Sequence, residues 1–247
     1  MATVLWGPDT AETYDASSPE MFAPELLTRT VDVLAELAGD GAALELAVGT
    51  GRVALPLSAR GVPVSGIELS PHMVEQLRRK PGAEAVPVTI GDMTSTRVPG
   101  RFALAYLVFN TIMNVTTQDE QVAVFVNAAA HLEPGGRFVV EVVVPQLRRL
   151  VPGELGRVFD LQPDHVGIET FDDPVGQVTW SHHWTVVDGR LQRDSAPYRY
   201  VWPSELDLMA RLAGLRLRDR WADWTRAAFG SDSRSHVSVY EKVATGP

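Results

Sequence analysis

The chain has 247 residues, of which 45% are hydrophobic and 21% are charged, and its formal net charge is −9. This length suits one α/β domain with an elaboration, or two small domains. The acidic charge disfavours a nucleic-acid partner, because binding phosphates needs clustered Lys and Arg, and the absence of cysteine excludes disulfides and thiolate metal sites.

No targeting or membrane segment is expected. The first residues, Met1 to Trp6, lack the basic region and apolar stretch of a signal peptide. No apolar run approaches the ~18 residues that a membrane span needs. We therefore expect a cytoplasmic protein with neither a membrane nor a nucleic acid as partner.

The chain begins with a segment that we expect to be irregular. Residues 6–21 contain Pro8 and Pro19, which are breakers of regular structure. Residues 24–37 then show helical spacing of apolar residues, and Gly39 can cap that helix.

Residues 42–48 are almost wholly apolar and predict a strand that is buried on both faces of a parallel sheet. Gly49 and Gly51 follow, which permits positive φ and lets a ligand lie against bare backbone. Residues 52–59 have helical spacing, and the helix N-terminus offers free N–H groups and a partial positive charge. Strand, glycine turn and helix together predict a nucleotide-type cofactor site.

A second apolar run, residues 62–67, ends at Glu68. An acidic residue about 20 residues after the glycine turn, at the end of a second strand, is placed to accept hydrogen bonds from a ribose diol. Two ligand classes fit this arrangement, a dinucleotide and S-adenosylmethionine.

Three details favour S-adenosylmethionine. Glu45 lies inside the first strand, where dehydrogenases usually carry only apolar residues. Asp92 follows a third apolar run, residues 85–90, and can bind the adenine. Phe109 closes a fourth run, residues 102–109.

The remaining elements complete an alternation of strands and helices. Ser70 and Pro71 start a helix as its N-cap and first residue, and Thr117 can cap another helix that runs to His131. Residues 138–144 predict the fifth strand. This spacing predicts a doubly wound parallel sheet, and residues 215–221 and 236–243 would raise its strands to seven.

The pattern of predicted elements changes after Pro145. Short antiparallel strands are expected at 155–161, 166–171, 177–187 and 191–201, and a helix at 204–213. Asp188-Gly189 is a two-residue hairpin signal. We expect a cofactor domain of residues 1–150 plus 203–247, and a cap or substrate subdomain of residues 151–202.

Four motifs together resemble the class I S-adenosylmethionine-dependent methyltransferases. They are the Glu45–Arg52 stretch ELAVGTGR, Glu68-Leu69-Ser70, Gly91-Asp92-Met93 and Leu132-Glu133-Pro134-Gly135-Gly136. The resemblance implies an α/β fold with a Rossmann-like, doubly wound, seven-stranded sheet whose last two strands form an antiparallel hairpin, and a small antiparallel β cap inserted after the fifth strand. It implies S-adenosyl-L-methionine as cofactor, with a tyrosine folded over its methionine end. The residues expected to contact it are Tyr14, Glu45, Ala47, Gly49, Gly51, Arg52, Glu68, Leu69, Met73, Asp92, Met93 and Phe109.

Catalysis is expected to depend mainly on positioning, since the methyl sulfonium is already electrophilic and orientation can supply up to ~7–11 kcal/mol. The reacting atom should lie outside the carboxyl ends of the fourth and fifth strands. Metal-dependent relatives carry carboxylates near Asn110, so this asparagine argues against a metal. Enzymes of the family that methylate nucleobases carry a Pro-Pro-aromatic run there, where this chain has Thr111-Ile112-Met113.

Four residues are candidates for chemistry: Glu141, His182, Asn114 and Tyr198. Glu141 lies inside the fifth strand, where a carboxylate needs a partner, and a structural ion pair is the alternative. Strand alternation places His182 on one face with Trp180 and Trp184. These aromatic residues predict a substrate pocket, and a small core or a homodimer face are the alternatives.

Within the family, the chain is similar to bacterial sugar N-methyltransferases of the desosamine type, which have a cap sheet and a glutamate in the fifth strand. They carry a histidine after the fourth strand, where this chain has Asn114. We expect methyl transfer to N or O of a small molecule. An NAD-dependent oxidoreductase and a catalytically silent, cofactor-binding interaction protein are the alternatives.

Overall fold

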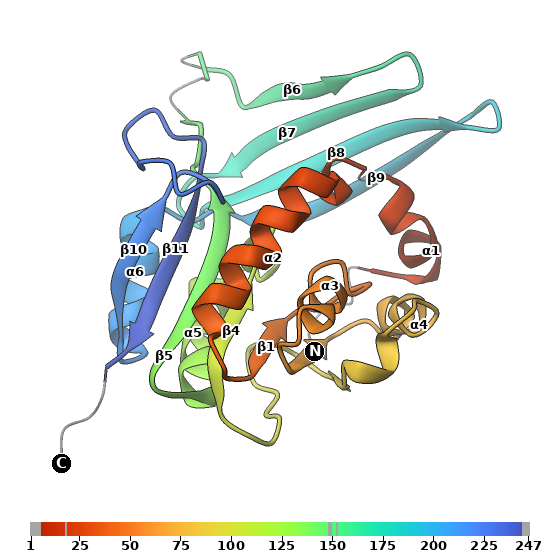
Figure 1. Cartoon of the computed structure of the whole chain (residues 1–247). Helices are drawn as coiled ribbons and strands as arrows, with labels where there is room; N and C mark the ends of the chain where they lie inside the picture. The colour runs from red at the N-terminus through yellow and green to blue at the C-terminus, as the bar shows by residue number, and fades with distance from the viewer. Residues whose placement is uncertain (1–5, 18, 148–149, 152, 244–247) are drawn as a thin grey trace.

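The computed structural model describes residues 6–17, 19–147, 150–151 and 153–243. It contains one sheet of seven strands and one of four (Figure 1). The helices are α1 (Pro8–Ser17), η1 (Pro19–Phe22), α2 (Pro24–Ala38), α3 (Ala54–Ala59), α4 (Pro71–Arg78), η2 (Ala83–Ala85), η3 (Thr111–Asn114), α5 (Gln118–His131) and α6 (Pro203–Leu212). The strands are β1 (Ala43–Leu46), β2 (Val64–Glu68), β3 (Val88–Ile90), β4 (Phe102–Leu107), β5 (Leu132–Val143), β6 (Gly156–Leu161), β7 (His165–Asp173), β8 (Val178–Val187), β9 (Arg190–Arg199), β10 (Leu215–Trp221) and β11 (Ser235–Lys242).

The seven-stranded sheet has the order β10-β11-β5-β4-β1-β2-β3. Strands β1 to β5 are parallel to one another, whereas β11 is antiparallel to both β5 and β10. The predicted Rossmann-like, doubly wound sheet and its terminal hairpin are thus confirmed. The fifth strand is longer than expected, because it begins at Leu132, which already pairs with Phe102.

Two apolar cores hold helices against opposite faces of this sheet. Leu34 of α2 and Leu57 of α3 belong to one core, and Phe125 of α5 and Leu206 of α6 belong to the other. Figure 1 shows α2 crossing the near face, with α5 and α6 behind the sheet. No helix among the described residues is long and apolar enough to cross a membrane.

Local signals set the helix starts as predicted. Ser70 Oγ accepts from the Met73 backbone N–H, and Pro71 occupies the first turn of α4. Thr117 and Glu120 form a reciprocal capping box at α5, in which each side chain binds the other's backbone N–H. These contacts satisfy N–H groups that the first turn of a helix leaves without an intrahelical partner.

The segment after Trp6 is helical, so the expectation of an irregular start was wrong. Pro8 is the first residue of α1, a position where proline is tolerated because its missing N–H would have no helical partner. Asp15 holds α1 to the cofactor turn, since its carboxylate accepts from Thr50 Oγ1 at 2.6 Å and forms an ion pair with Lys80. The expectation about a signal peptide concerns Met1 to Leu5, which lie outside the described residues.

Strands β6 to β9 form an antiparallel meander, as predicted. Asp188 and Gly189 both have positive φ, at 50° and 72°, which is the conformation of a two-residue hairpin turn. Figure 1 shows this sheet lying across the end of the seven-stranded sheet toward which β5 points. We call the four-stranded sheet β6–β9 the cap sheet.

Candidate active site

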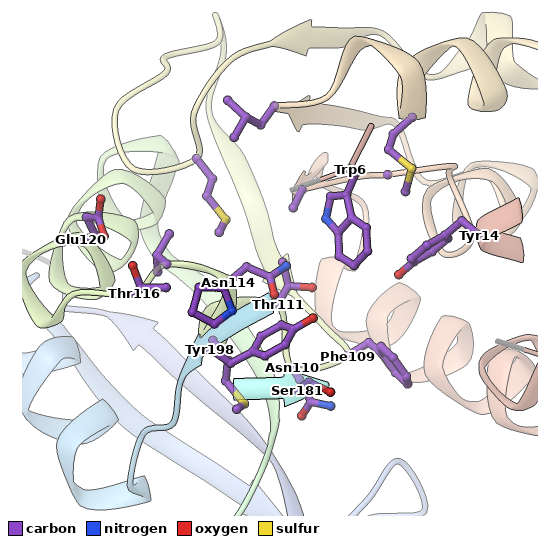
Figure 2. Close-up of a pocket in the computed structure, with 18 of the residues that line it drawn as sticks. Trp6, Tyr14, Phe109, Asn110, Thr111, Asn114, Thr116, Glu120, Ser181 and Tyr198 are labelled. Atoms are coloured by element: carbon purple, nitrogen blue, oxygen red, sulfur yellow. The ribbon is translucent and has the colours of Figure 1, made fainter. Parts of the chain in front are cut away.

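A cavity of about 940 Å³ lies between the cap sheet and the carboxyl ends of β1, β2 and β4 (Figure 2). A smaller cavity of about 40 Å³ adjoins it and shares Tyr14, Ala47, Gly49, Phe109 and Thr111 with it. All predicted cofactor residues except Gly51 line one cavity or the other. The large cavity therefore joins the predicted cofactor site to the cap sheet.

The glycine turn exposes backbone to the cavity at two positions. Ala47 and Gly49 line it with left-handed φ values of 54° and 55°. Gly51 also has positive φ, 79°, but a Cβ there would lie 3.0 Å from side-chain atoms of Leu55 and Leu77. Gly51 is thus required by its backbone conformation and by helix packing, and the structure does not place it against the cofactor space as expected.

Glu68 is positioned by the backbone on both sides of it. Its two carboxylate oxygens accept from the N–H groups of Gly49 and Ser70, both at 2.8 Å. Burial raises the pKa of Glu68, and these hydrogen bonds oppose that rise. Each oxygen keeps a second lone pair, and the residue lines the cavity, so the carboxylate fits the predicted contact with a ribose diol.

The loop after β3 forms the next part of the wall. Asp92 Oδ1 accepts from Thr94 N at 2.8 Å, so this carboxylate stabilises its own turn while it faces the cavity. A Cβ on Gly91 would meet Thr96 Oγ1 at 2.2 Å, which explains the glycine there. Three apolar residues predicted to contact the cofactor also line the cavity: Leu69, Met73 and Met93.

Glu45 and Arg52 line the smaller cavity. Tyr106 donates to Glu45 Oε2 at 2.9 Å, and both residues are buried. Burial raises the pKa of Glu45 to about 8, against the Tyr106 hydrogen bond and the Arg52 charge. The Arg52 guanidinium donates to Met21 O and lies 5.4 Å from the ring centre of Phe109. An acid and a base in one small cavity match the amine and carboxylate of a bound methionine moiety.

Tyr14 lies in α1 and lines both cavities. Its ring meets the Trp6 ring edge to face at 5.4 Å, and Trp6 O accepts from Ser70 Oγ at 2.6 Å. Burial raises the pKa of Tyr14, so its phenol stays protonated at neutral pH. These positions suit a tyrosine that covers one end of the cofactor.

The turn after β4 forms another part of the cavity wall, next to the cap sheet. Phe109 and Asn110 both have left-handed φ values, 55° and 61°, and Asn110 Oδ1 accepts from Val143 N at 2.8 Å. Figure 2 shows the side chains of Asn114 and Tyr198 reaching the cavity from η3 and from the cap sheet. The structure thus brings two of the four predicted chemical residues together.

Glu141 does not line either cavity. Its two carboxylate oxygens accept from Phe109 N at 2.9 Å and from Trp224 Nε1 at 2.7 Å. Burial raises the pKa of Glu141, and both hydrogen bonds oppose that rise. The predicted catalytic role therefore has no support in the geometry: Glu141 supports the turn at Phe109 from beneath.

His182 does not line the cavity, so its position does not support the role that we predicted. Its Nδ1 is 2.8 Å from Ser195 Oγ, its Nε2 is 3.3 Å from Thr170 Oγ1, and its ring stacks on Trp180. The opposite face of β8 carries Ser181, which lines the cavity with Tyr198 of β9. Trp180 reaches the lining, whereas His182 and Trp184 do not. Tyr200, which follows Tyr198 by two residues, is buried in the core.

Several lining residues were missed from the sequence. They include Trp6, Thr116, Arg157, Phe159, Glu169 and Ser181. For Ser181 the signal was available, because strand alternation offered its face as the only alternative to that of His182. Arg157 and Glu169 form an ion pair at 2.7 Å across β6 and β7, which depends on a register that the sequence does not reveal.

Among the described residues, no group of three or more His, Asp or Glu side chains is arranged to hold a metal ion. The polar groups of the two cavities are compatible with the contacts expected for S-adenosylmethionine. Glu68 lies where a diol could donate to it, Asp92 where an adenine amine could, and Glu45 and Arg52 carry charges that an amine and a carboxylate could pair with. The left-handed Gly49 leaves backbone accessible beside them.

One prediction concerns Glu68. Glu68→Ala is expected to weaken S-adenosylhomocysteine binding by ~1.5–3 kcal/mol, because it removes a charged acceptor. Titration calorimetry measures this, and Glu169→Ala, which removes a carboxylate from the far wall, should bind normally. Equal affinities for the two variants would remove Glu68 from the cofactor site.

Comparisons with known proteins agree with this site. Residues 43–136 match the family model of a methyltransferase domain. The CcbJ methyltransferase of Streptomyces caelestis is 36% identical, with a TM-score of 0.86 over 97% of this chain and 98% of that one. The cypemycin N-terminal methyltransferase of a Streptomyces species is 25% identical over 203 residues, 81% of this chain and 82% of the relative.

A third protein shares the fold at lower identity. SAM-bound CalS10, an amino pentose methyltransferase of Micromonospora echinaspora, has a TM-score of 0.70 and 22% identity over 94% of this chain and 97% of that one. The identity to CcbJ extends over nearly the whole of both chains, and the two cavities are lined by all but one of the residues expected to contact the cofactor. This chain belongs to the S-adenosylmethionine-dependent methyltransferases, and S-adenosyl-L-methionine is its cofactor.

Proposed function

We propose that the protein transfers the methyl group of S-adenosylmethionine to an amine nitrogen of a small natural product, without a metal. The observation that carries this proposal is the cavity of about 940 Å³, which the cofactor residues and the cap sheet line together. Residues 1–150 with 203–247 would serve as the cofactor domain, and residues 151–202 as the substrate subdomain.

When bound, S-adenosylmethionine supplies an electrophilic methyl group on a positively charged sulfur. The residues of this chain would hold its ends through Glu68, Asp92, Glu45 and Arg52. The cap sheet and α1 cover the cavity and limit water. Orientation of the acceptor is then the main contribution to the rate, since aligned reactants can gain roughly 7–11 kcal/mol.

The acceptor side of the cavity is largely uncharged, which favours a neutral amine. Its polar side chains include Asn110, Thr111, Asn114, Thr116 and Tyr198. Its charged groups are already engaged: Glu169 pairs with Arg157, and Glu120 caps α5. An ammonium ion would lose hydration there without gaining a free counter-charge, so the site favours the free base, whose lone pair is the nucleophile.

The relatives support an amine acceptor. One is named for methylation at an N-terminus and a fold neighbour for methylation of an amino pentose. Asn114 and the Tyr198 hydroxyl have no hydrogen-bond partner within the described part of the chain, so both can bind an acceptor. We assign them to acceptor positioning.

The test combines radiolabelled methyl transfer with mass spectrometry. The protein is incubated with methyl-tritiated S-adenosylmethionine and a panel of amino sugars, aminoacyl amides and matched hydroxyl analogues. Label should enter the amines, and Tyr198→Phe should lower turnover at least tenfold while S-adenosylhomocysteine affinity stays within twofold. Label in the hydroxyl analogues alone would show that the acceptor atom is oxygen and not nitrogen.

Family membership decides against the NAD-dependent alternative, and NADH should not raise the melting temperature of the protein.

Metal independence gives a separate prediction. Turnover is expected to survive dialysis against EDTA, because Asn110 stands where metal-dependent relatives have a carboxylate and its Oδ1 is engaged by Val143 N. Initial rates before and after dialysis measure this. A loss that added magnesium reverses would overturn the metal-free mechanism.

A further inference from the structure

Four polar side chains form a continuous hydrogen-bonded chain across the cap sheet. Ser181 Oγ lies 2.9 Å from His183 Nε2, His183 Nδ1 lies 3.0 Å from His165 Nε2, and His165 Nδ1 lies 2.7 Å from Asp160 Oδ2. Ser181 lines the cavity, whereas the Asp160 side chain is 37% exposed. The chain therefore connects the acceptor side of the cavity with the surface.

The proton positions along this chain can be assigned in one consistent way. The Asp160 carboxylate can only accept, so His165 donates from Nδ1 and accepts at Nε2. His183 then donates from Nδ1 and accepts at Nε2, which leaves Ser181 as the donor to His183. Every hydrogen bond thus points away from the cavity, and the Ser181 oxygen keeps lone pairs for a ligand.

The surroundings favour these contacts. Ser181 and His183 lie two residues apart on one face of β8, and the His183 and His165 rings stack at 5.2 Å between centres. The Phe159 ring meets His183 edge to face at 5.5 Å. It occupies the space that Gly167 leaves, since a Cβ there would lie 2.4 Å from Phe159 Cε2.

We propose that Ser181, His183, His165 and Asp160 form a proton relay that removes the acceptor's proton during methyl transfer. The inference rests on the proposed function. Ser181 is the catalytic residue that meets the acceptor, and the other three are positioning residues that act through it.

The step balances as follows. The acceptor nitrogen gains a carbon–nitrogen bond, while the carbon–sulfur bond of the methyl donor breaks and its electron pair stays on sulfur. The methylated amine gives its proton to Ser181 Oγ, and the Ser181 hydroxyl proton moves to His183 Nε2. The Asp160 carboxylate, which is reached through His165, stabilises the resulting imidazolium, which loses its proton to water when the product leaves.

The net effect of its surroundings is to lower the pKa of the His183 imidazole. Burial and His165 lower the pKa of His183, as does His182, while Asp194 on β9 and Asp160 on β6 raise it. Arg157 and Glu169 lie on the same face and neutralise each other. A lowered pKa keeps the His183 imidazole neutral at neutral pH, so its Nε2 is available to accept a proton.

The first experiment needs no acceptor. Long-range ¹H–¹⁵N correlation spectra of the full-length protein, with S-adenosylhomocysteine bound, report which nitrogen of each histidine carries the proton. We expect the Nδ1–H form for His183 and His165, and Ser181→Ala should shift the His183 Nε2 resonance. An Nε2–H form for His183 would overturn the relay, whether or not an acceptor is known.

The second experiment measures turnover with the acceptor found in the panel above. His183→Gln is expected to lower kcat roughly 100-fold and to remove the low-pH inflection of kcat, because a general base contributes roughly 10²–10⁴-fold. His182→Gln changes the neighbouring histidine on the opposite face and is the matched control. It should keep both the kcat and the low-pH inflection of the wild type. Melting temperatures identify variants that are merely unstable.

The outcomes separate the two proposals. If no panel acceptor is methylated but the tautomers are as expected, the proposed acceptor class fails while the relay geometry stands. If transfer occurs and His183→Gln keeps the rate and the pH profile of the wild type, the relay is overturned and the chain only ties the strands together.

Discussion

Between pH 6.5 and pH 9 the unliganded wild-type protein is expected to lose about 2 kcal/mol more unfolding free energy than the Glu45→Gln variant. The cause is the buried Glu45 carboxyl, whose pKa burial raises from 4.5 to about 8. Over this range the folded state loses a proton that the unfolded chain has already lost. A group with a raised folded pKa stabilises the fold below its unfolded pKa, and that stability disappears as pH rises through the folded pKa.

The pH window is chosen to isolate this group. His236 acts in the opposite direction, because burial lowers its pKa to about 3, but that contribution changes only below about pH 6.5. Glu45→Gln keeps an oxygen that can accept from Tyr106 and removes the titration. Urea denaturation of both proteins at matched ionic strength gives the difference. Parallel stability curves would show that Glu45 is ionised throughout.

Glu141→Ala is expected to lower the unfolding free energy by roughly 2–6 kcal/mol, because it leaves two donors without an acceptor and each unsatisfied group costs ~1–3 kcal/mol. The donors are Phe109 N and Trp224 Nε1. Glu141→Gln keeps one carbonyl oxygen and should lose less. Denaturation curves measure both changes.

The glutamine variant also decides between support and catalysis at this position. Turnover per folded molecule should stay within about threefold of the wild type, since the side chain of Glu141 does not line the cavity. A collapse of kcat at an unchanged melting temperature would restore Glu141 to the chemistry.

Local signals in the sequence predicted most of the fold. The caps at Ser70 and Thr117 and the Asp188-Gly189 turn need only neighbouring residues, and each was found where expected. The prediction of an irregular segment at Pro8 was wrong because proline occurs at the first turn of helices as well as at their breaks. Most residues predicted to contact the cofactor line the two cavities, because they follow consecutive strand ends.

The lining of the cavity by the cap sheet could not be predicted in this way. Alternation assigned His182 and Ser181 to opposite faces of β8, but both faces carry polar and aromatic groups, so it could not say which one meets the cavity. Glu141 finds Trp224 in the loop between β10 and β11, and no local pattern predicts that partner. The proposed relay depends on the pairing of three cap strands, which only the folded structure defines.

The turn at Phe109 and Asn110 limits how this enzyme can diversify. A left-handed asparagine is tolerated, but a bulky residue such as phenylalanine at φ 55° holds that conformation only under outside restraint, which Glu141 supplies. Substitutions at positions 109, 110 or 141 are therefore expected to disturb the backbone of this turn before they change which acceptor the enzyme prefers. New acceptor preferences are therefore expected to arise by substitution at positions such as Asn114, Thr116 and Tyr198, where the side chain can change while the backbone stays the same.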